Sequence, residues 1–197
     1  MMKTASRLSK LGAAALLAVG AVGTMQAHAQ EKFTYMTNWY AQAEHGGFYQ
    51  AVATGLYKKY GLDVTIKMGG PQVNIMQLLA AGQTDCVMGY DVQTFKSWEQ
   101  GINAVTVAAS FQKDPQVILT HPGVAASFAD LAKLDKVLIS DGGVTTFWAW
   151  MISAYGFKPE QREVYTFNAA PLIANKTWGM QGYLTSEPFF VEKEAGF

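Results

Sequence analysis

Residues 33–67 constrain the fold of this chain more than any other stretch, because two strand patterns and a helix pattern follow one another there. Residues 33–37 have the composition of a strand, and residues 62–67 alternate apolar and polar side chains as a half-buried strand does. Between them, apolar side chains recur at helical spacing, at Phe48, Ala51, Val52, Gly55 and Leu56. Gly61 is placed to end this helix. The stretch therefore predicts a βαβ unit.

The loop at residues 38–48 is the first candidate for a binding site. It follows the first predicted strand and combines an amide, aromatic rings, an acid and an imidazole. In open α/β sheets, ligands bind outside the carboxyl ends of strands, which is where this loop lies.

Helix and strand patterns keep alternating along the rest of the chain. Helices are expected at residues 71–80, 92–100, 144–155 and 171–176, and a last helical segment opens at residues 186–188. Strands are expected at residues 86–88, 104–108, 116–120, 137–140, 163–167 and 180–184. This alternation is typical of doubly wound α/β sheets. A polar break at residues 112–115 indicates a crossover, so we predict a first α/β lobe at residues 30–115 and a second at residues 116–197.

The first 29 residues have the three parts of a secretory signal peptide. Lys3, Arg7 and Lys10 precede an apolar run at residues 11–22, which is too short to cross a bilayer, and Ala27-His28-Ala29 is a small-residue cleavage site. We therefore predict a signal peptide at residues 1–29 and a mature protein in the periplasm. Because no cysteine lies near the cleavage site, a lipid anchor is not expected.

Charge and cysteine content exclude several classes of function. Without the signal segment, 12 basic and 15 acidic residues leave a net charge near −3, and no run rich in lysine and arginine is present, so nucleic acid is not an expected partner. The single cysteine, Cys86, rules out an internal disulfide and fits a buried strand position. The histidines lack a second His or carboxylate at metal-ligand spacing, so we expect no metal. No Walker loop or hydrolase nucleophile elbow is present.

Several motifs together resemble one protein family. They are Asn38-Trp39 with His45-Gly46-Gly47-Phe48, residues 55–64 (GLYKKYGLDV), residues 68–71 (MGGP), residues 82–85 (GQTD), residues 165–168 (YTFN) and residues 182–188 (GYLTSEP). This combination resembles the NMT1/THI5-like substrate-binding proteins, in the wider SsuA/TauA group of ABC importers. The resemblance covers nearly the whole predicted mature chain.

The resemblance implies a type II periplasmic-binding-protein fold, in which two α/β lobes close on a small molecule. It also implies a monomer that delivers its ligand to an ABC permease, without catalysis or a cofactor, and the most similar branch handles thiamine-precursor pyrimidines. Such chains normally continue further, so we expect an incomplete second lobe and return crossing here. Two alternatives stay open. One is a thiamine pyrimidine synthase-like enzyme that uses pyridoxal phosphate, histidine and iron, although its cysteine-rich motif is missing. The other is a truncated reading frame without function.

Three candidate ligand-binding residues come from the first loop. Trp39 is expected to be an aromatic platform for a planar heterocycle, with a core tryptophan as the alternative. Asn38 can both donate to and accept from the edge of an aminopyrimidine, with an Asx turn as the alternative. His45 stands where a helix begins and is expected to be a ligand contact or a capping residue.

The other candidates follow later strands. Tyr90 comes directly after a strand, and Tyr165 belongs to the YTFN motif of the resemblance. Thr145 and Thr146 open a predicted helix, where free N–H groups and hydroxyls suit an oxygen of the ligand. Glu187 is expected to be the recognition acid for an exocyclic amine, since Pro188 restricts it to an extended backbone at a strand end. The alternative for Glu187 is an acid that favours a helix start.

Overall fold

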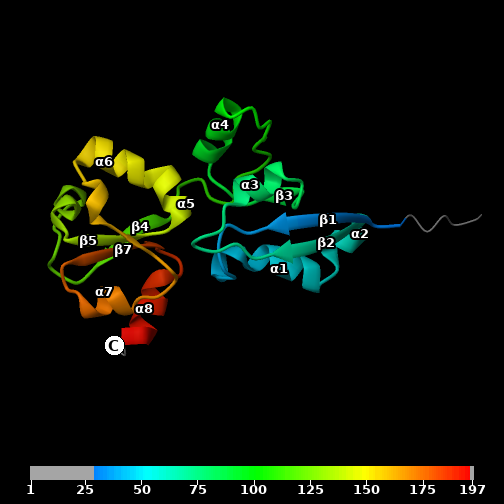
Figure 1. Ribbon diagram of the computed structural model, residues 1–197. Coiled ribbons are helices and arrows are strands. Elements are labelled where there is room, and N and C mark those ends of the chain that lie inside the picture. Colours follow the sequence, from blue (N-terminus) through cyan, green and yellow to red (C-terminus); the bar gives the residue numbers. More distant parts are fainter. Residues whose placement is uncertain (1–28, 196–197) are drawn as a thin grey trace, which may run out of the picture.

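Residues 29–195 are described by the computed structural model, and they form two β-sheets flanked by helices (Figure 1). Apart from Ala29, the predicted signal peptide lies outside the described residues. The mixed α/β architecture agrees with the predicted fold class and is compatible with an incomplete periplasmic-binding-like fold. None of the helices within the described part of the chain is long and apolar enough to cross a membrane.

The first sheet is parallel and has the strand order β2-β1-β3. Its strands are β1 (Glu31–Met36), β2 (Leu62–Lys67) and β3 (Cys86–Val87). Its helices are α1 (Gly46–Ala53), α2 (Leu56–Lys59), α3 (Ile75–Ala80) and α4 (Asp91–Glu99), with a short 3-10 turn η1 (Ala43–His45) before α1. In register, Phe33 lies opposite Val64, so the predicted βαβ unit of residues 33–67 is confirmed.

The second sheet has the strand order β4-β7-β5-β6, with β4 antiparallel to β7 and the other pairs parallel. Its strands are β4 (Gln116–Thr120), β5 (Lys136–Ile139), β6 (Arg162–Val164) and β7 (Trp178–Tyr183). The helices around it are η2 (Phe128–Lys133), α5 (Asp141–Gly143), η3 (Val144–Trp148), α6 (Ala149–Tyr155), η4 (Pro159–Gln161), α7 (Ala170–Ala174) and α8 (Glu187–Ala195). Figure 1 shows α6 over one face of this sheet and α7 and α8 over the other.

The hydrophobic core is concentrated around the second sheet. One cluster joins Val137 and Ile139 to Trp148 and Met151 beneath α6, and all four are at least nine-tenths buried. A second cluster on the opposite face includes Tyr165. Because both faces of β5 are covered, its residues form an apolar run instead of an alternating pattern.

The predicted strand at residues 104–108 is wrong. These residues have no regular secondary structure, and β3, an edge strand of the first sheet, pairs only with β1 within the described residues. The carbonyl of Ala104 instead accepts the indole N–H of Trp98 at 2.6 Å. The apolar side chains of Val105 and Val107 are 72% and 82% exposed. Valine favours strands, but here no neighbouring strand pairs with the segment and covers these side chains.

Several helix boundaries also differ from the sequence-based expectations. The helix expected after residue 71 begins only at Ile75, because Asn74 caps it by accepting the N–H of Gln77 at 3.1 Å. The helix expected at residues 92–100 begins one residue earlier, at Asp91, with Tyr90 as its N-cap residue. Gly55 adopts a positive φ of 70° and divides the first helix into α1 and α2.

Glu187 was expected in an extended conformation, and this expectation is wrong. It is the first residue of α8, where proline at the next position is compatible with the first helical turn. Its carboxylate oxygen Oε2 accepts the backbone N–H of Tyr183 at 2.7 Å and the hydroxyl of Ser186 at 3.0 Å. Although Glu187 itself is helical, these bonds hold its carboxylate at the end of β7.

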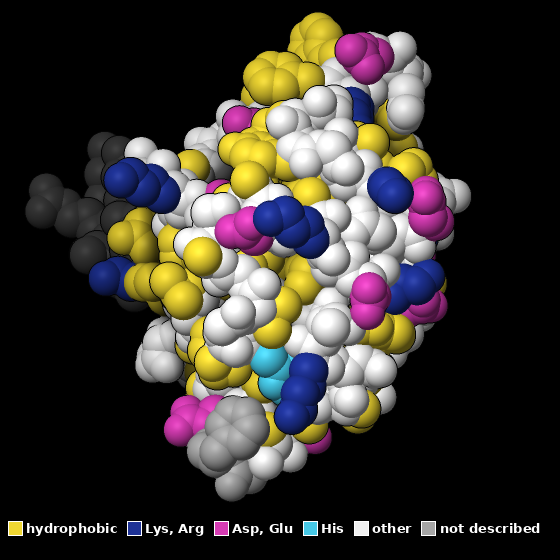
Figure 2. Space-filling model, turned by 90° about the vertical axis from the view of Figure 1, so that its left-hand side faces the viewer, with side chains coloured by type: hydrophobic (Ala, Val, Ile, Leu, Met, Phe, Trp, Pro, Cys, Tyr) yellow, Lys and Arg dark blue, Asp and Glu magenta, His cyan; other side chains and the backbone are white. Residues whose placement is uncertain are grey.

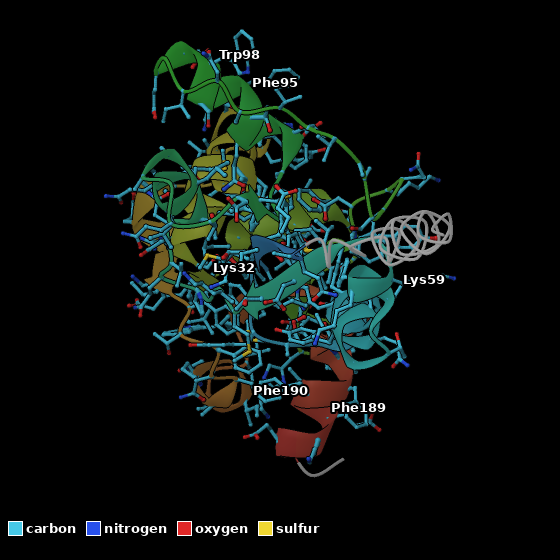
Figure 3. All side chains as sticks on the ribbon, turned by 90° about the vertical axis from the view of Figure 1, so that its right-hand side faces the viewer. Lys32, Lys59, Phe95, Trp98, Phe189 and Phe190 are labelled. Carbon is cyan, nitrogen blue, oxygen red and sulfur yellow. The ribbon has the colours of Figure 1, made fainter. Side chains whose placement is uncertain are left out.

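The surface carries exposed aromatic side chains and mixed charge. Figure 3 shows Phe95 and Trp98 projecting from α4, and Phe189 and Phe190 on α8. Phe189 is 73% exposed, whereas Phe190 stacks on Phe167 with ring centroids 5.1 Å apart. On the face shown in Figure 2, basic and acidic side chains are scattered among each other without a block of one sign.

Candidate ligand-binding cleft

Loops that follow strands of both sheets meet at one cleft. They come after β1, β3, β5 and β7, whose carboxyl ends bring residues distant in sequence together. The cleft encloses about 590 Å³ of space without protein atoms, part of it open to solvent. Its lining residues are Asn38, Trp39, Gln42, Glu44, Gly70, Val73, Ile75, Tyr90, Gln93, Gln116, Ser140, Gly142, Gly143, Phe147, Gln181, Gly182, Tyr183 and Glu187.

Trp39 forms an aromatic wall of the cleft. Its indole stacks on Tyr165 with ring centroids 5.7 Å apart and an angle of 23° between the planes. Phe167 and Tyr40 contact it edge-on, at centroid distances of 6.1 Å and 6.4 Å. Tyr165 therefore covers one face of the indole. The segments that follow β1 and β2 approach each other closely at Gly69, where a Cβ atom would lie 2.3 Å from the carbonyl oxygen of Thr37.

Two carboxylates from distant parts of the chain lie close to one hydroxyl in the cleft. Glu44 belongs to η1 and Glu187 to α8, and the hydroxyl of Ser186 lies 3.2 Å from Oε1 of Glu44 and 3.0 Å from Oε2 of Glu187. Ser186 has one hydroxyl proton, so it can donate to only one of them at a time. Glu187 is 2% exposed, and its second oxygen, Oε1, accepts only the Nε2–H of Gln42 at 3.3 Å. The cleft therefore retains unused acceptor capacity at both acids.

The described residues that line the cleft include no lysine, arginine or histidine. Two glutamates thus face each other without a basic lining residue to neutralise them. Such a surface favours ligand amines and disfavours phosphate or sulfonate groups.

A pair of phenols connects the two sides of the cleft. The hydroxyl oxygens of Tyr90, after β3, and Tyr183, at the end of β7, are 2.6 Å apart. Burial raises the pKa of Tyr183 to about 12 and raises the pKa of Tyr90 as well. Both phenols therefore stay protonated near neutral pH and can donate as well as accept.

His45 lies behind the cleft lining and reaches it through Asn38. It is completely buried, its Nδ1 accepts the backbone N–H of Gln42 at 3.2 Å, and its Nε2 lies 3.2 Å from Oδ1 of Asn38. Burial lowers the pKa of His45, while the nearby Glu44 opposes this shift. The imidazole is thus held neutral beside the cleft.

The structure brings four of the predicted site residues to the cleft lining: Asn38, Trp39, Tyr90 and Glu187. His45 and Tyr165 lie one layer behind them, against Asn38 and Trp39 respectively. Thr145 and Thr146 do not line it, because both hydroxyls donate to the carbonyl of Gly142, at 3.0 Å and 2.9 Å. Their role as ligand contacts stays a prediction.

Most of the polar side chains that line the cleft were not predicted from the sequence. Gln181 is a buried amide on β7 whose Oε1 accepts the backbone N–H of Ser140 at 2.7 Å. The amide of Gln116 donates to the carbonyl of Gly182 at 3.0 Å. A glutamine inside an apolar strand pattern is the signal that could have identified Gln181, because a buried amide needs a partner.

Metal-binding side chains do not gather in this structure. Within residues 29–195, no group of three or more His, Cys, Asp or Glu side chains is arranged to hold a metal ion.

Comparison with known proteins gives two results. The family model described as "NMT1/THI5 like" matches residues 42–191, which include most of the cleft lining. A protein of Haemophilus influenzae (strain ATCC 51907 / DSM 11121 / KW20 / Rd) with the name "Putative thiamine biosynthesis protein" is 27% identical over 115 residues. This match covers 57% of the chain and 36% of the relative, so it spans about a third of the relative's length.

Proposed function

Because the chain belongs to the NMT1/THI5-like family, we propose that it is the solute-binding component of an ABC importer and binds a small planar nitrogen heterocycle in the cleft. The family includes ABC substrate-binding proteins as well as proteins of thiamine biosynthesis. A periplasmic location is part of the proposal and depends on the signal peptide predicted at residues 1–29. The partner would be the ABC permease.

The observation on which the ligand class depends is the pair of facing carboxylates, Glu44 and Glu187, in a cleft whose described lining has no basic residue. Oε1 of Glu187 can accept a further hydrogen bond from an exocyclic amine. The aromatic wall at Trp39 supplies a stacking surface next to these acceptors. An aminopyrimidine of the kind used as a thiamine precursor has both the planar ring and the amine, and the relative's name supports this choice.

The alternative, a thiamine pyrimidine synthase-like enzyme, is favoured by the name of the relative but not by the cleft. The residues lining it include no lysine amine to which pyridoxal phosphate could attach, and no basic side chain for its phosphate. The described residues also lack a cluster of metal ligands suitable for iron. These residues do not fit that pair of cofactors.

Calorimetric titration of the purified protein tests the proposal. The ligands are 4-amino-5-hydroxymethyl-2-methylpyrimidine, its phosphate ester and its 4-oxo analogue. We expect the aminopyrimidine to bind, and the other two to bind at least about tenfold more weakly, because one adds negative charge near Glu44 and Glu187 and the other lacks the amine. Tighter binding of the phosphate ester would contradict the proposal, as would equal affinity for all three.

Variants at the aromatic wall provide a second readout. Trp39→Phe keeps a ring against Tyr165, whereas Trp39→Leu keeps only apolar volume. We expect the aminopyrimidine to bind Trp39→Leu more weakly than Trp39→Phe, by about 0.5–1.5 kcal/mol, the usual contribution of an aromatic pair. Equal affinity of the two variants would show that the ligand does not stack on Trp39.

A further inference from the structure

Two buried glutamines near the second sheet use their side-chain carbonyls in the same way. Gln181 on β7 is 6% exposed, and its Oε1 accepts the backbone N–H of Ser140 at 2.7 Å. Gln161 in η4 is 7% exposed, and its Oε1 accepts the backbone N–H of Lys158, also at 2.7 Å. Because a backbone N–H can only donate, the oxygen end of each amide is identified, and the nitrogen end is directed elsewhere.

The nitrogen ends of the two amides differ. Nε2 of Gln161 donates to the carbonyl of Ala132, at 3.0 Å, and to that of Leu134, so both of its protons have acceptors. Nε2 of Gln181 makes no hydrogen bond with the described residues. Nor is it one of the side-chain polar atoms of these residues that are enclosed without a partner. Solvent therefore reaches Nε2 of Gln181, although the side chain as a whole is buried.

The amide of Gln181 lies at the cleft and is held in one orientation. Gln181 lines the cleft together with Ser140, Gly143 and Phe147, so the solvent that reaches Nε2 is that of the cleft. A Cβ atom at Gly143 would lie 2.7 Å from Oε1 of Gln181, so the backbone there packs closely against the oxygen end. Turning the amide over would place Nε2 against the N–H of Ser140, which joins two donors without an acceptor. A ligand that displaces water from Nε2 without accepting its protons therefore leaves a buried donor unpaired, which weakens binding.

We propose that Gln181 is a specificity-determining residue whose Nε2 donates a hydrogen bond to an acceptor atom of the ligand, a ring nitrogen or a carbonyl oxygen. The inference rests on the proposed function, because it specifies how the same cleft recognises its ligand. Glu44 and Glu187 supply acceptors elsewhere in the cleft. The preferred ligand therefore combines a donor amine with a neutral acceptor atom, which is a narrower class than planar heterocycles in general.

The preference for a ring acceptor tests the inference. The probes are 4-amino-2-methylpyrimidine and 3-methylaniline, which share shape and amine but differ in the ring acceptors, and both are titrated calorimetrically at a pH where they are neutral. We expect the wild type to prefer the pyrimidine by about tenfold or more, since the aniline leaves the Nε2 protons of Gln181 unpaired. Gln181→Met keeps the length of the side chain without the donor, and it should reduce the preference to less than about threefold.

Gln161→Met is the matched control. It removes a similarly buried amide with the same kind of carbonyl bond, but the nitrogen of this amide is paired within the protein and the residue does not line the cleft. Gln161→Met should therefore keep the preference of the wild type, even where it lowers the melting temperature as much as Gln181→Met does. The same loss of preference in both variants, or a loss in neither, would overturn the inference and leave the proposed function intact.

Nuclear magnetic resonance of the wild type with 15N-labelled glutamine observes the donor directly and decides the question if a variant fails to fold. The pyrimidine should shift an Nε2 proton of Gln181 downfield, as a new hydrogen bond does, and it should leave the Nε2 protons of Gln161 in place. The aniline should not produce this downfield shift, and the absence of the shift with the bound pyrimidine would overturn the inference. Weak binding of both probes to the wild type would instead refute the proposed function, and the inference with it.

Discussion

The hydroxyl oxygens of Tyr90 and Tyr183 are 2.6 Å apart, although the two residues are separated by 93 positions in the chain. This contact joins the end of β3 in the first sheet to the end of β7 in the second. It is accompanied by the bond from Gln42 to Glu187 at 3.3 Å and by the bond from the backbone of Asp141 to the carbonyl of Pro71 at 2.9 Å. The two halves of the molecule are thus hydrogen-bonded across the cleft itself.

The phenol pair should contribute measurably to stability. Tyr90→Phe and Tyr183→Phe each remove one hydroxyl and keep the ring, so a double-mutant cycle isolates the bond between them. We expect a coupling free energy of about 0.5–1.5 kcal/mol, measured by urea denaturation. The control pair is Tyr90→Phe with Tyr155→Phe, because Tyr155 packs on Phe128, away from the cleft. Additive effects in both cycles would mean that the bond contributes nothing.

Glu187→Gln should weaken binding of the aminopyrimidine by about 1.5–3 kcal/mol, the range for hydrogen bonds to a charged group. The substitution keeps the size of the side chain and one acceptor oxygen for the N–H of Tyr183, so the melting temperature should change less than the affinity. Calorimetry and thermal denaturation of the same samples measure both quantities. Glu192→Gln, an exposed acid on the same helix, is the matched control. A lower melting temperature with unchanged affinity would assign Glu187 a structural role alone.

Gly182→Ala should destabilise the protein, whereas Gly142→Ala should not. A Cβ atom at Gly182 would lie 2.7 Å from Cβ and 2.8 Å from Cγ of Glu187, so the first turn of α8 would have to shift. At Gly142 the nearest atom, Oγ of Ser140, is 3.9 Å away. We expect a loss of about 1–3 kcal/mol in the free energy of unfolding for the first substitution, as for other overpacked sites. Denaturant titration measures it, and similar values for both variants would contradict this placement of Glu187.

The free energy of unfolding should fall as the pH decreases below about 6.5, the ordinary pKa of histidine. Burial lowers the pKa of His45 in the folded state, so in the interval between the folded-state and unfolded-state pKa values the unfolded chain binds more protons. The stabilisation is therefore fully present above the unfolded-state pKa and is lost as the pH falls towards the folded-state pKa. Denaturation of the wild type and His45→Gln from about pH 5 to about pH 8 measures this difference. Identical pH profiles would exclude a buried neutral His45.

Short sequence patterns predicted those parts of the fold that depend only on residues close together in the sequence. Gly61 ends a helix with a positive φ of 81°, as its position after a helical pattern indicated. The prediction of a strand at residues 104–108 was wrong because a strand needs a neighbouring strand to pair with, and the sequence of one segment does not show whether such a strand is present. For the same reason, no local pattern could place Tyr183 beside Tyr90.

The rule that a site residue directly follows a strand predicted most of the cleft residues that were found. Asn38, Trp39 and Tyr90 reached the cleft lining by that rule. Thr145 and Thr146 lie in η3, one short helix after β5, and their hydroxyls bond to the carbonyl of Gly142 in α5, as short polar side chains often do with a carbonyl three or four residues earlier. Glu187 reached the cleft from the start of a helix instead of a strand end. For Glu187, the predicted place in the cleft was right, whereas the predicted extended backbone was wrong.

The hydrogen bonds that join the two halves across the cleft set a condition on how the cleft can widen. Tyr90–Tyr183 and Gln42–Glu187 both bridge it, so a ligand larger than its opening can enter only after these bonds separate. Opening would then precede capture, and the observed association rate would level off at high ligand concentration instead of rising in proportion to it. The speed of uptake would depend on how often the protein opens, and the ligand's own chemistry would decide how long it stays.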